Sequence, residues 1–135
     1  MWFTREQFQV CQELKQWGLE PRFEPGDVVA RGFADLGFEE FQVLPGRVLL
    51  SLTAGTTSPL PEEHVVHFFW IPSVDEAVDL LERRGVECRA AHRHDGRTWT
   101  FQISHEGALE SFEGESLHDA ALAALAATLR RLYRS

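Results

Sequence analysis

Three stretches of the chain carry apolar residues at the spacing of a helix. The first follows Thr4 and repeats apolar positions every three or four residues as far as Trp17. A second follows Ser73 and ends at Gly85, and a third follows Ser116. This spacing is typical of helices that bury one face. The pattern therefore predicts three amphipathic helices.

Capping signals mark the starts of the first two predicted helices. Thr4 and Gln7 can form a capping box, in which each side chain bonds the backbone N–H of the other residue, and Ser73 and Glu76 repeat this arrangement. A glycine at position 18 ends the first helical pattern in the way that glycine commonly ends helices.

Strand-like runs, separated by turns that contain glycine or proline, fill the chain between these helices. The predicted strands cover residues 27–34, 38–44, 47–53, 64–71, 86–94, 97–104 and 108–113. The run 64–71, HVVHFFWI, is almost entirely apolar, which predicts a strand inside the sheet. The order α-β-β-β-β-α-β-β-β-α predicts the α+β class with a mainly antiparallel sheet and three helices.

The Asp95-Gly96 pair is a strong signal for a two-residue hairpin turn. Such a turn fixes which residues of the hairpin share a face, because side chains alternate along each strand. The predicted apolar face consists of Cys88, Ala90, His92, Trp99, Phe101 and Ile103. The predicted polar face supplies the candidate interaction surface, which consists of Arg89, Arg93, Thr98, Thr100 and Gln102.

One sequence phrase occurs twice. Residues 12–22 read QELKQWGLEPR and residues 79–89 read DLLERRGVECR, so a glycine, a glutamate and an arginine recur at a constant offset. Each copy is the end of a helix followed by strands. We therefore expect a single domain over 1–135, built from two similar helix–hairpin halves, 1–54 and 64–135, which the loop 54–63 joins.

Composition narrows the classes of function. The chain of 135 residues has a net charge of −8, which argues against nucleic-acid binding, since binders of that class carry a clustered basic face. Two cysteines are too few for a disulfide framework or a metal cluster and fit a reducing cytoplasm. No apolar run approaches the ~20 residues of a membrane span. We expect a cytoplasmic protein that does not enter membranes.

The second half of the chain resembles the phage ABA-sandwich domains. The resemblance rests on the helix start Pro72-Ser73-Val74-Asp75, the helix that ends at glycine, the strand Thr98-Trp99-Thr100-Phe101 and the phrase FEGESLHDAALAAL at 112–125. It covers residues 71–133. Proteins of that family look like accessory proteins rather than enzymes, so the resemblance implies a small accessory protein of phage or prophage origin.

Residues 7–54 also resemble the type III secretion chaperones, which are small, acidic and dimeric. Their order of helix, three strands and helix suits this region. The run 64–71 does not fit their pattern. This second resemblance implies a chaperone-like dimer.

Three histidines could support a different activity. His92 and His94 are two positions apart in a predicted strand, so they point to the same side and could share a metal, with His105 or Glu106 as a third ligand. That set would suit a metal-dependent hydrolase or nuclease. Alternatively, the pair flanks a hairpin turn simply because polar residues belong there. His64 and His67 are three apart, which in a strand places them on opposite faces, with His67 buried.

An acidic patch follows this hairpin. Its members are Glu106, Glu110, Glu113 and Glu115. The patch could meet a basic partner, or it could be a solvated sheet edge that discourages aggregation. The sequence leaves the two readings open.

Apart from the three histidines, no combination of residues in the sequence indicates catalysis. Cys11 and Cys88 lie on apolar faces, where a cysteine usually acts as a small hydrophobic side chain. We therefore expect a protein that is not an enzyme and has no cofactor. Its function would be to bind another protein, and the aromatic and alanine-rich surfaces leave a homodimer open.

Overall fold

The computed structural model describes residues 2–33 and 37–134 and divides the chain into two compact units, Met1–Ile71 and Pro72–Ser135. Both units contain helices and antiparallel strands, so the predicted α+β class is confirmed. The division at Ile71 differs from the predicted halves. Residues 54–63 lie inside the first unit, because a further strand and a 3-10 helix begin there. Ala34, the predicted end of the first strand, lies outside the described residues.

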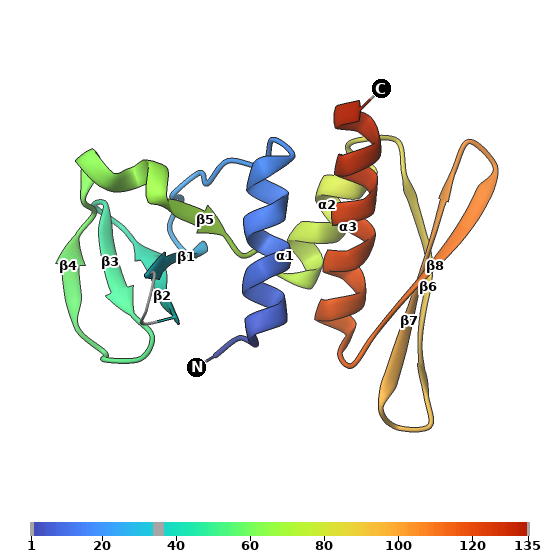
Figure 1. The fold of residues 1–135 in the computed structure, drawn as a ribbon, viewed down its shortest axis with the longest axis horizontal. Helices are drawn as coiled ribbons and strands as arrows, with labels where there is room; N and C mark the ends of the chain where they lie inside the picture. The colour runs from blue at the N-terminus through green and yellow to red at the C-terminus, as the bar shows by residue number, and fades with distance from the viewer. Residues whose placement is uncertain (1, 34–36, 135) are drawn as a thin grey trace. The chain divides into compact units, whose positions relative to one another are not determined.

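The first unit combines one helix with a five-stranded sheet (Figure 1). Helix α1 (Arg5–Gln16) begins at the predicted capping box, in which the Gln7 N–H donates to the Thr4 hydroxyl at 3.1 Å and the Thr4 N–H donates to the Gln7 side chain at 2.9 Å. The strand order is β4-β3-β2-β1-β5. The strands are β1 (Val28–Phe33), β2 (Gly37–Leu44), β3 (Val48–Ser51), β4 (Thr57–Pro59) and β5 (Phe68–Trp70).

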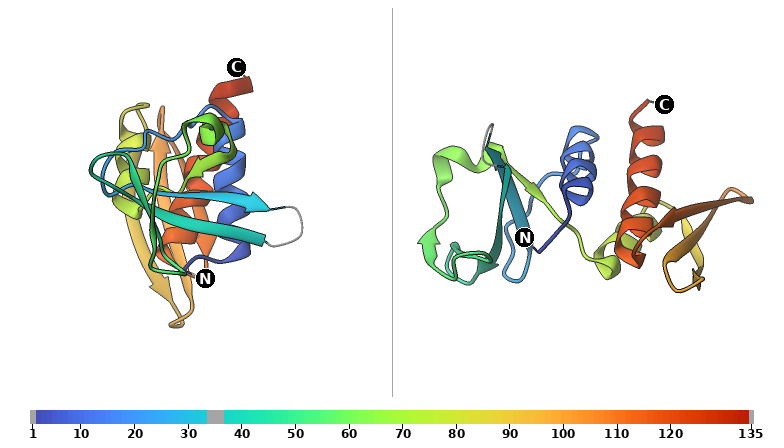
Figure 2. Two further views of the ribbon diagram at one scale, coloured as in Figure 1. Left: turned by 90° about the vertical axis from the view of Figure 1, so that its left-hand side faces the viewer. Right: turned by 60° about the horizontal axis from the view of Figure 1, so that its bottom comes forward.

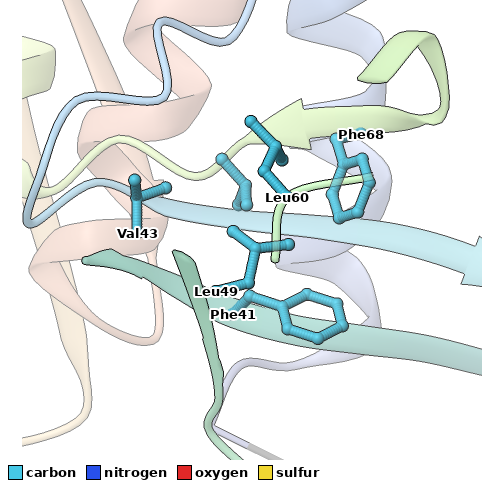
Figure 3. Packing of buried hydrophobic residues seen from close by; sticks show 6 residues of the cluster. Phe41, Val43, Leu49, Leu60 and Phe68 are labelled. Carbon is cyan, nitrogen blue, oxygen red and sulfur yellow. The ribbon is translucent and has the colours of Figure 1, made fainter. Parts of the chain in front are cut away.

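Apolar side chains cover both faces of this sheet. On one face, the Phe8 ring of α1 stacks on Phe38 with 4.5 Å between the ring centroids. Phe41 lies an odd number of residues further along β2, so it points to the other face, where the core cluster of the unit lies. This cluster consists of Val29, Phe41, Val43, Leu49, Leu60 and Phe68 (Figure 3).

The run 64–71 is not one strand. Residues Glu62–His67 form the 3-10 helix η1, and only Phe68–Trp70 pair with β1. Two features of the neighbouring residues accompany this difference. Pro61 and two glutamates stand directly before the run, at the start of η1. The Lys15 ammonium group donates hydrogen bonds to the Val66 and Phe68 carbonyls, where the strand begins. The segment bends at His64, whose φ of −121° and ψ of 15° are not helical.

His64 and His67 consequently lie together rather than on opposite faces. Their rings stack with 5.8 Å between centroids, and both side chains are exposed. The predictions of opposite faces and of a buried His67 are therefore wrong.

Glu40, in the middle of β2, is fully buried. Its Oε1 accepts a hydrogen bond from the Trp2 backbone N–H at 2.7 Å, while its Oε2 has no hydrogen-bond partner. The Trp2 indole N–H donates to the Leu52 carbonyl at 2.8 Å. The segment before α1 is thereby tied to the sheet at two points.

The second unit has two helices on one side of a three-stranded sheet (Figures 1 and 2). Its elements are α2 (Val74–Glu82), β6 (Glu87–His94), β7 (Thr98–His105), β8 (Ala108–Gly114) and α3 (Leu117–Arg134). The strand order is β6-β7-β8. No helix within the described residues has both the length and the apolar content that crossing a bilayer requires.

The repeated sequence phrase corresponds to one repeated local structure, the end of a helix. Gly18 and Gly85 have φ of 101° and 78°, a conformation that glycine adopts without a steric penalty. The next residue then bonds back to the carbonyl five positions earlier, from Leu19 to Leu14 and from Val86 to Leu81. Beyond this point the copies differ, because β6 begins at residue 87 whereas a loop follows the first copy.

Candidate functional site

The loop between β6 and β7 decides which residues of the candidate interaction surface lie together. It has three residues, 95–97, because His94 pairs with Thr98. Asp95 and Gly96 both have positive φ, at 50° and 71°. The predicted two-residue turn is therefore wrong by one residue. A slip of one residue moves every side chain of a strand to the other face.

The predicted faces change accordingly. Thr98, Thr100 and Gln102 lie opposite His94, His92 and Ala90, in that order. Arg93 lies opposite Trp99 and so belongs to the other face. Arg89 is the extra residue of a β-bulge between Cys88 and Ala90, which restores Cys88 to a position opposite Ile103. The structure thus keeps three residues of the predicted interaction surface together and separates the two arginines from them.

The three strands present a face that no helix of their own unit covers. We call it the outer face. It consists of Glu87, Ala90, His92, His94, Thr98, Thr100, Gln102, Ser104, Leu109, Ser111 and Glu113. Helix α3 packs on the opposite face, where Phe101 and Ile103 are buried. The outer face is polar apart from Leu109, which is 60% exposed, and from Ala90. Across it, the Gln102 amide donates to the Ser111 hydroxyl at 3.4 Å.

The candidate metal ligands do not converge. The His92 and His94 rings lie on the outer face with 5.5 Å between their centroids. His105 points to the helix-covered face, at the far end of β7 from their partners Thr98 and Thr100. Among the described residues, no group of three His, Cys, Asp or Glu side chains is placed to hold a metal ion. A hydrolase site built from these three histidines does not fit this placement, since zinc needs at least three protein ligands.

A small recess opens between the helix-covered face of the sheet and the ends of α2 and α3. Its lining residues are Arg84, Val86, Ile103, His105, Thr128, Arg131 and Leu132. Thr128 is 5% exposed, and its hydroxyl has no hydrogen-bond partner. The recess has room for roughly one water molecule. It therefore suits a hydration site that satisfies Thr128 better than a substrate pocket.

Charged side chains surround the mouth of this recess. Arg131 forms an ion pair with Glu110 of β8, at 2.7 Å. The hydrogen bond from Arg131 lowers the pKa of the Glu110 carboxyl, and the charge of His105 lowers it further. Apart from His105, no sequence pattern indicated this cluster, because Thr128 and Arg131 look like ordinary positions of a long helix.

Neither thiol is in an environment that would activate it. Burial raises the pKa of Cys11 to about 12. The pKa of Cys88 is also raised, first by burial and second by the negative charge of Glu82. Reactive cysteines have lowered pKa values, since the thiolate is the nucleophile. Both thiols are thus protonated at neutral pH, as expected of cysteines that serve as packing residues.

This difference in burial predicts that the two thiols react separately. With a chromogenic disulfide reagent at slightly alkaline pH, we expect the native protein to react slowly at Cys88, which is partly exposed, and to release one equivalent of the coloured thiol. Cys11 should react only after denaturation. The Cys88→Ser variant should then be nearly inert in its native state, and the Cys11→Ser variant should keep the slow phase. Rapid labelling of Cys88→Ser would contradict the assignment.

Comparison with protein-family models, with characterised proteins and with solved structures finds no match for this chain. The resemblances to phage ABA-sandwich domains and to secretion chaperones therefore remain predictions from the sequence.

Proposed function

We propose that this protein is a small, non-catalytic accessory protein that binds another protein through the outer face of β6, β7 and β8. The observation that carries the proposal is the placement of Thr98 and Gln102, both half-buried, on either side of the buried Thr100, on a polar face that the helices of the same unit leave uncovered. The raised pKa values of both thiols support a role without nucleophilic chemistry.

The dimensions of the outer face limit the affinity that it can supply. Three strands spaced about 4.8 Å apart, each with about eight residues rising about 3.3 Å, span roughly 350 Å². A standard interface buries about 800 Å² on each partner, so the outer face alone would give a weak and transient complex. Such binding suits an accessory protein that acts on its partner briefly.

The origin and compartment belong to the same proposal. The resemblance of residues 71–133 to phage ABA-sandwich proteins supports a phage or prophage origin, and the two free cysteines fit the reducing cytoplasm. The genes beside this one would test the origin directly. Structural or replication genes of a phage as neighbours would support it.

The binding proposal predicts the result of a comparative capture experiment. The wild-type chain, a Thr98→Arg/Gln102→Arg variant and a control Gln9→Arg/Thr56→Arg variant would each be immobilised and exposed to lysate of the native host. The control places the same charges at exposed positions of the first unit. We expect a partner that the wild type and the control retain equally, and that the outer-face variant loses at least tenfold.

Two results would contradict the proposal. One is equal retention of every captured protein by all three chains. The other is loss with the control as well, which would indicate a general effect of charge. Circular dichroism of each variant would first establish that it is folded.

A further inference from the structure

Both outer strands of the second unit have an unpaired edge. Within the part of the chain that the structure describes, β6 and β8 each pair with β7 alone. They contain eight and seven residues, whereas the outer strands of the first sheet, β4 and β5, contain three each. Short outer strands are a common protection against unwanted pairing. Over residues 87–94 and 108–114, the only backbone hydrogen bond outside the ladders joins the Arg97 N–H to the His94 carbonyl at the turn. The two long edges thus offer N–H and C=O groups to a further strand.

The two edges carry opposite charge. Arg89 and Arg93 lie on β6 and are exposed, and the single acidic residue of that strand, Glu87, is paired with Arg89 at 2.9 Å. β8 carries Glu110 and Glu113 and has no basic residue. Its acidic character continues on both sides, at positions 106 and 115. A strand of the β6 type is therefore the electrostatic complement of β8.

The charged residues of β6 and β8 also lie on matching faces of the sheet. Glu113 belongs to the outer face, as do His92 and His94. Glu110 lies opposite Ile103, and Arg93 lies opposite Trp99, so both belong to the helix-covered face. If β6 of a second copy lies beside β8 with the outer faces aligned, the imidazoles lie on the same face as the Glu113 carboxylate. Arg93 then shares a face with Glu110, whose carboxylate Arg131 of α3 already pairs at 2.7 Å, so Glu113 is the main acidic group that β8 offers.

A two-fold symmetric contact between two identical strand edges lacks this charge complementarity. A β8–β8 contact would set glutamates against glutamates, and a β6–β6 contact would set arginines against arginines. Like charges directly opposite each other destabilise a strand pair. The bulge at Arg89 leaves Ala90–His94 as the regular part of β6, which limits the contact to about one short strand.

We infer that β6 of one copy pairs with β8 of a second copy and joins the copies head to tail in one continuous sheet. The contact uses two different edges, so each added copy leaves one edge of each kind open and the assembly can grow. This inference concerns the strand edges and does not depend on the proposed binding through the outer face.

Sedimentation velocity of the full chain tests the inference. We expect the average mass to increase with protein concentration at low ionic strength and to return to that of the monomer when salt screens the exposed charges. A wild-type chain that stays monomeric at every concentration in low salt would overturn the inference.

Charge reversal identifies the edges involved. The Ser111→Lys/Glu113→Lys variant makes β8 basic, and the His92→Glu/Arg93→Glu variant makes β6 acidic; all four positions are exposed. Each variant alone should associate at least tenfold more weakly than the wild type. An equimolar mixture of the two should associate again, because each basic edge then finds an acidic one.

A matched control separates this result from an effect of net charge. The Glu20→Lys/Thr56→Lys variant carries the same change in charge as the β8 variant at exposed positions of the first unit, and it should associate like the wild type. A mixture that stays monomeric would overturn the inference. So would a β6 variant that associates as well as the wild type, since that result indicates a two-fold β8 contact.

Discussion

The Phe68→Ala variant should lose about 3–5 kcal/mol of its free energy of unfolding, the usual range for truncating a buried phenylalanine. Phe68 is fully buried, and its ring meets Phe41 and Phe23 edge-on, with 5.8 Å and 5.9 Å between centroids. The Arg31 guanidinium lies 5.4 Å from the centre of the same ring. Removing the ring therefore takes the contacts of three side chains at once and leaves a cavity in the core cluster of the first unit.

Urea unfolding followed by circular dichroism measures this loss. The Val66→Ala variant is the control, because Val66 lies two residues away in η1 and is 68% exposed, so its truncation should change the free energy by less than about 0.5 kcal/mol. If Phe68→Ala does not fold, Phe68→Leu keeps most of the volume and should lose about 1–1.5 kcal/mol. Equal losses for Phe68→Ala and Val66→Ala would contradict the placement of Phe68 in the core.

The sequence predicted the helix ends well because their signals are local. Both capping boxes, at Thr4 and at Ser73, formed between residues three apart. The glycines that end α1 and α2 adopt the same backbone conformation, which the repeated phrase had indicated. Each of these features depends on a few neighbouring residues and needs no knowledge of distant contacts.

The strands were less predictable because their pairing depends on distant residues. The run 64–71 is apolar enough for a strand, yet only residues 68–70 form a ladder with β1, which Ile71 extends by one hydrogen bond to the Val28 carbonyl. The burial of Glu40 could not be foreseen either, since its hydrogen-bond donor is Trp2, 38 positions earlier. Polarity alone places a glutamate on the surface.

The candidate site shows how a small difference in register changes a functional reading. With the predicted turn at Asp95-Gly96, His92 and His105 share a face. With the observed pairing of His94 and Thr98, they lie on opposite faces, and the metal-site hypothesis loses its third ligand. The same change of register places Arg93 opposite Trp99, apart from the threonines, and the bulge takes Arg89 out of the ladder. Neither a one-residue longer loop nor a bulge leaves a clear pattern in the sequence of one strand.

The Gly114→Ala variant should lose about 1–3 kcal/mol of its free energy of unfolding, as expected when an overpacked site forces the backbone to move. Gly114 ends β8 and lies opposite Trp99. A Cβ atom there would lie 2.7 Å from the Ala120 backbone nitrogen and 2.7 Å from the Asp119 Cβ. Both atoms belong to the first turn of α3, which the Ser116 hydroxyl caps by accepting from the Asp119 N–H at 3.0 Å. The methyl group can be accommodated only if the start of α3 moves away from the sheet.

Gly32→Ala is a matched control for this prediction, because neither glycine has the positive φ that would itself strain an alanine. The atoms nearest to a Cβ at Gly32 belong to the side chains of Phe38 and Gln12, at 3.4 Å and 3.6 Å. Alanine at a compatible glycine position restricts the unfolded chain and can stabilise a protein by about 0.4–1 kcal/mol. We therefore expect the two substitutions to shift the urea midpoint in opposite directions. A Gly114→Ala protein as stable as Gly32→Ala would contradict the close approach of α3 to β8, since the glycine in FEGESL would then have no packing role.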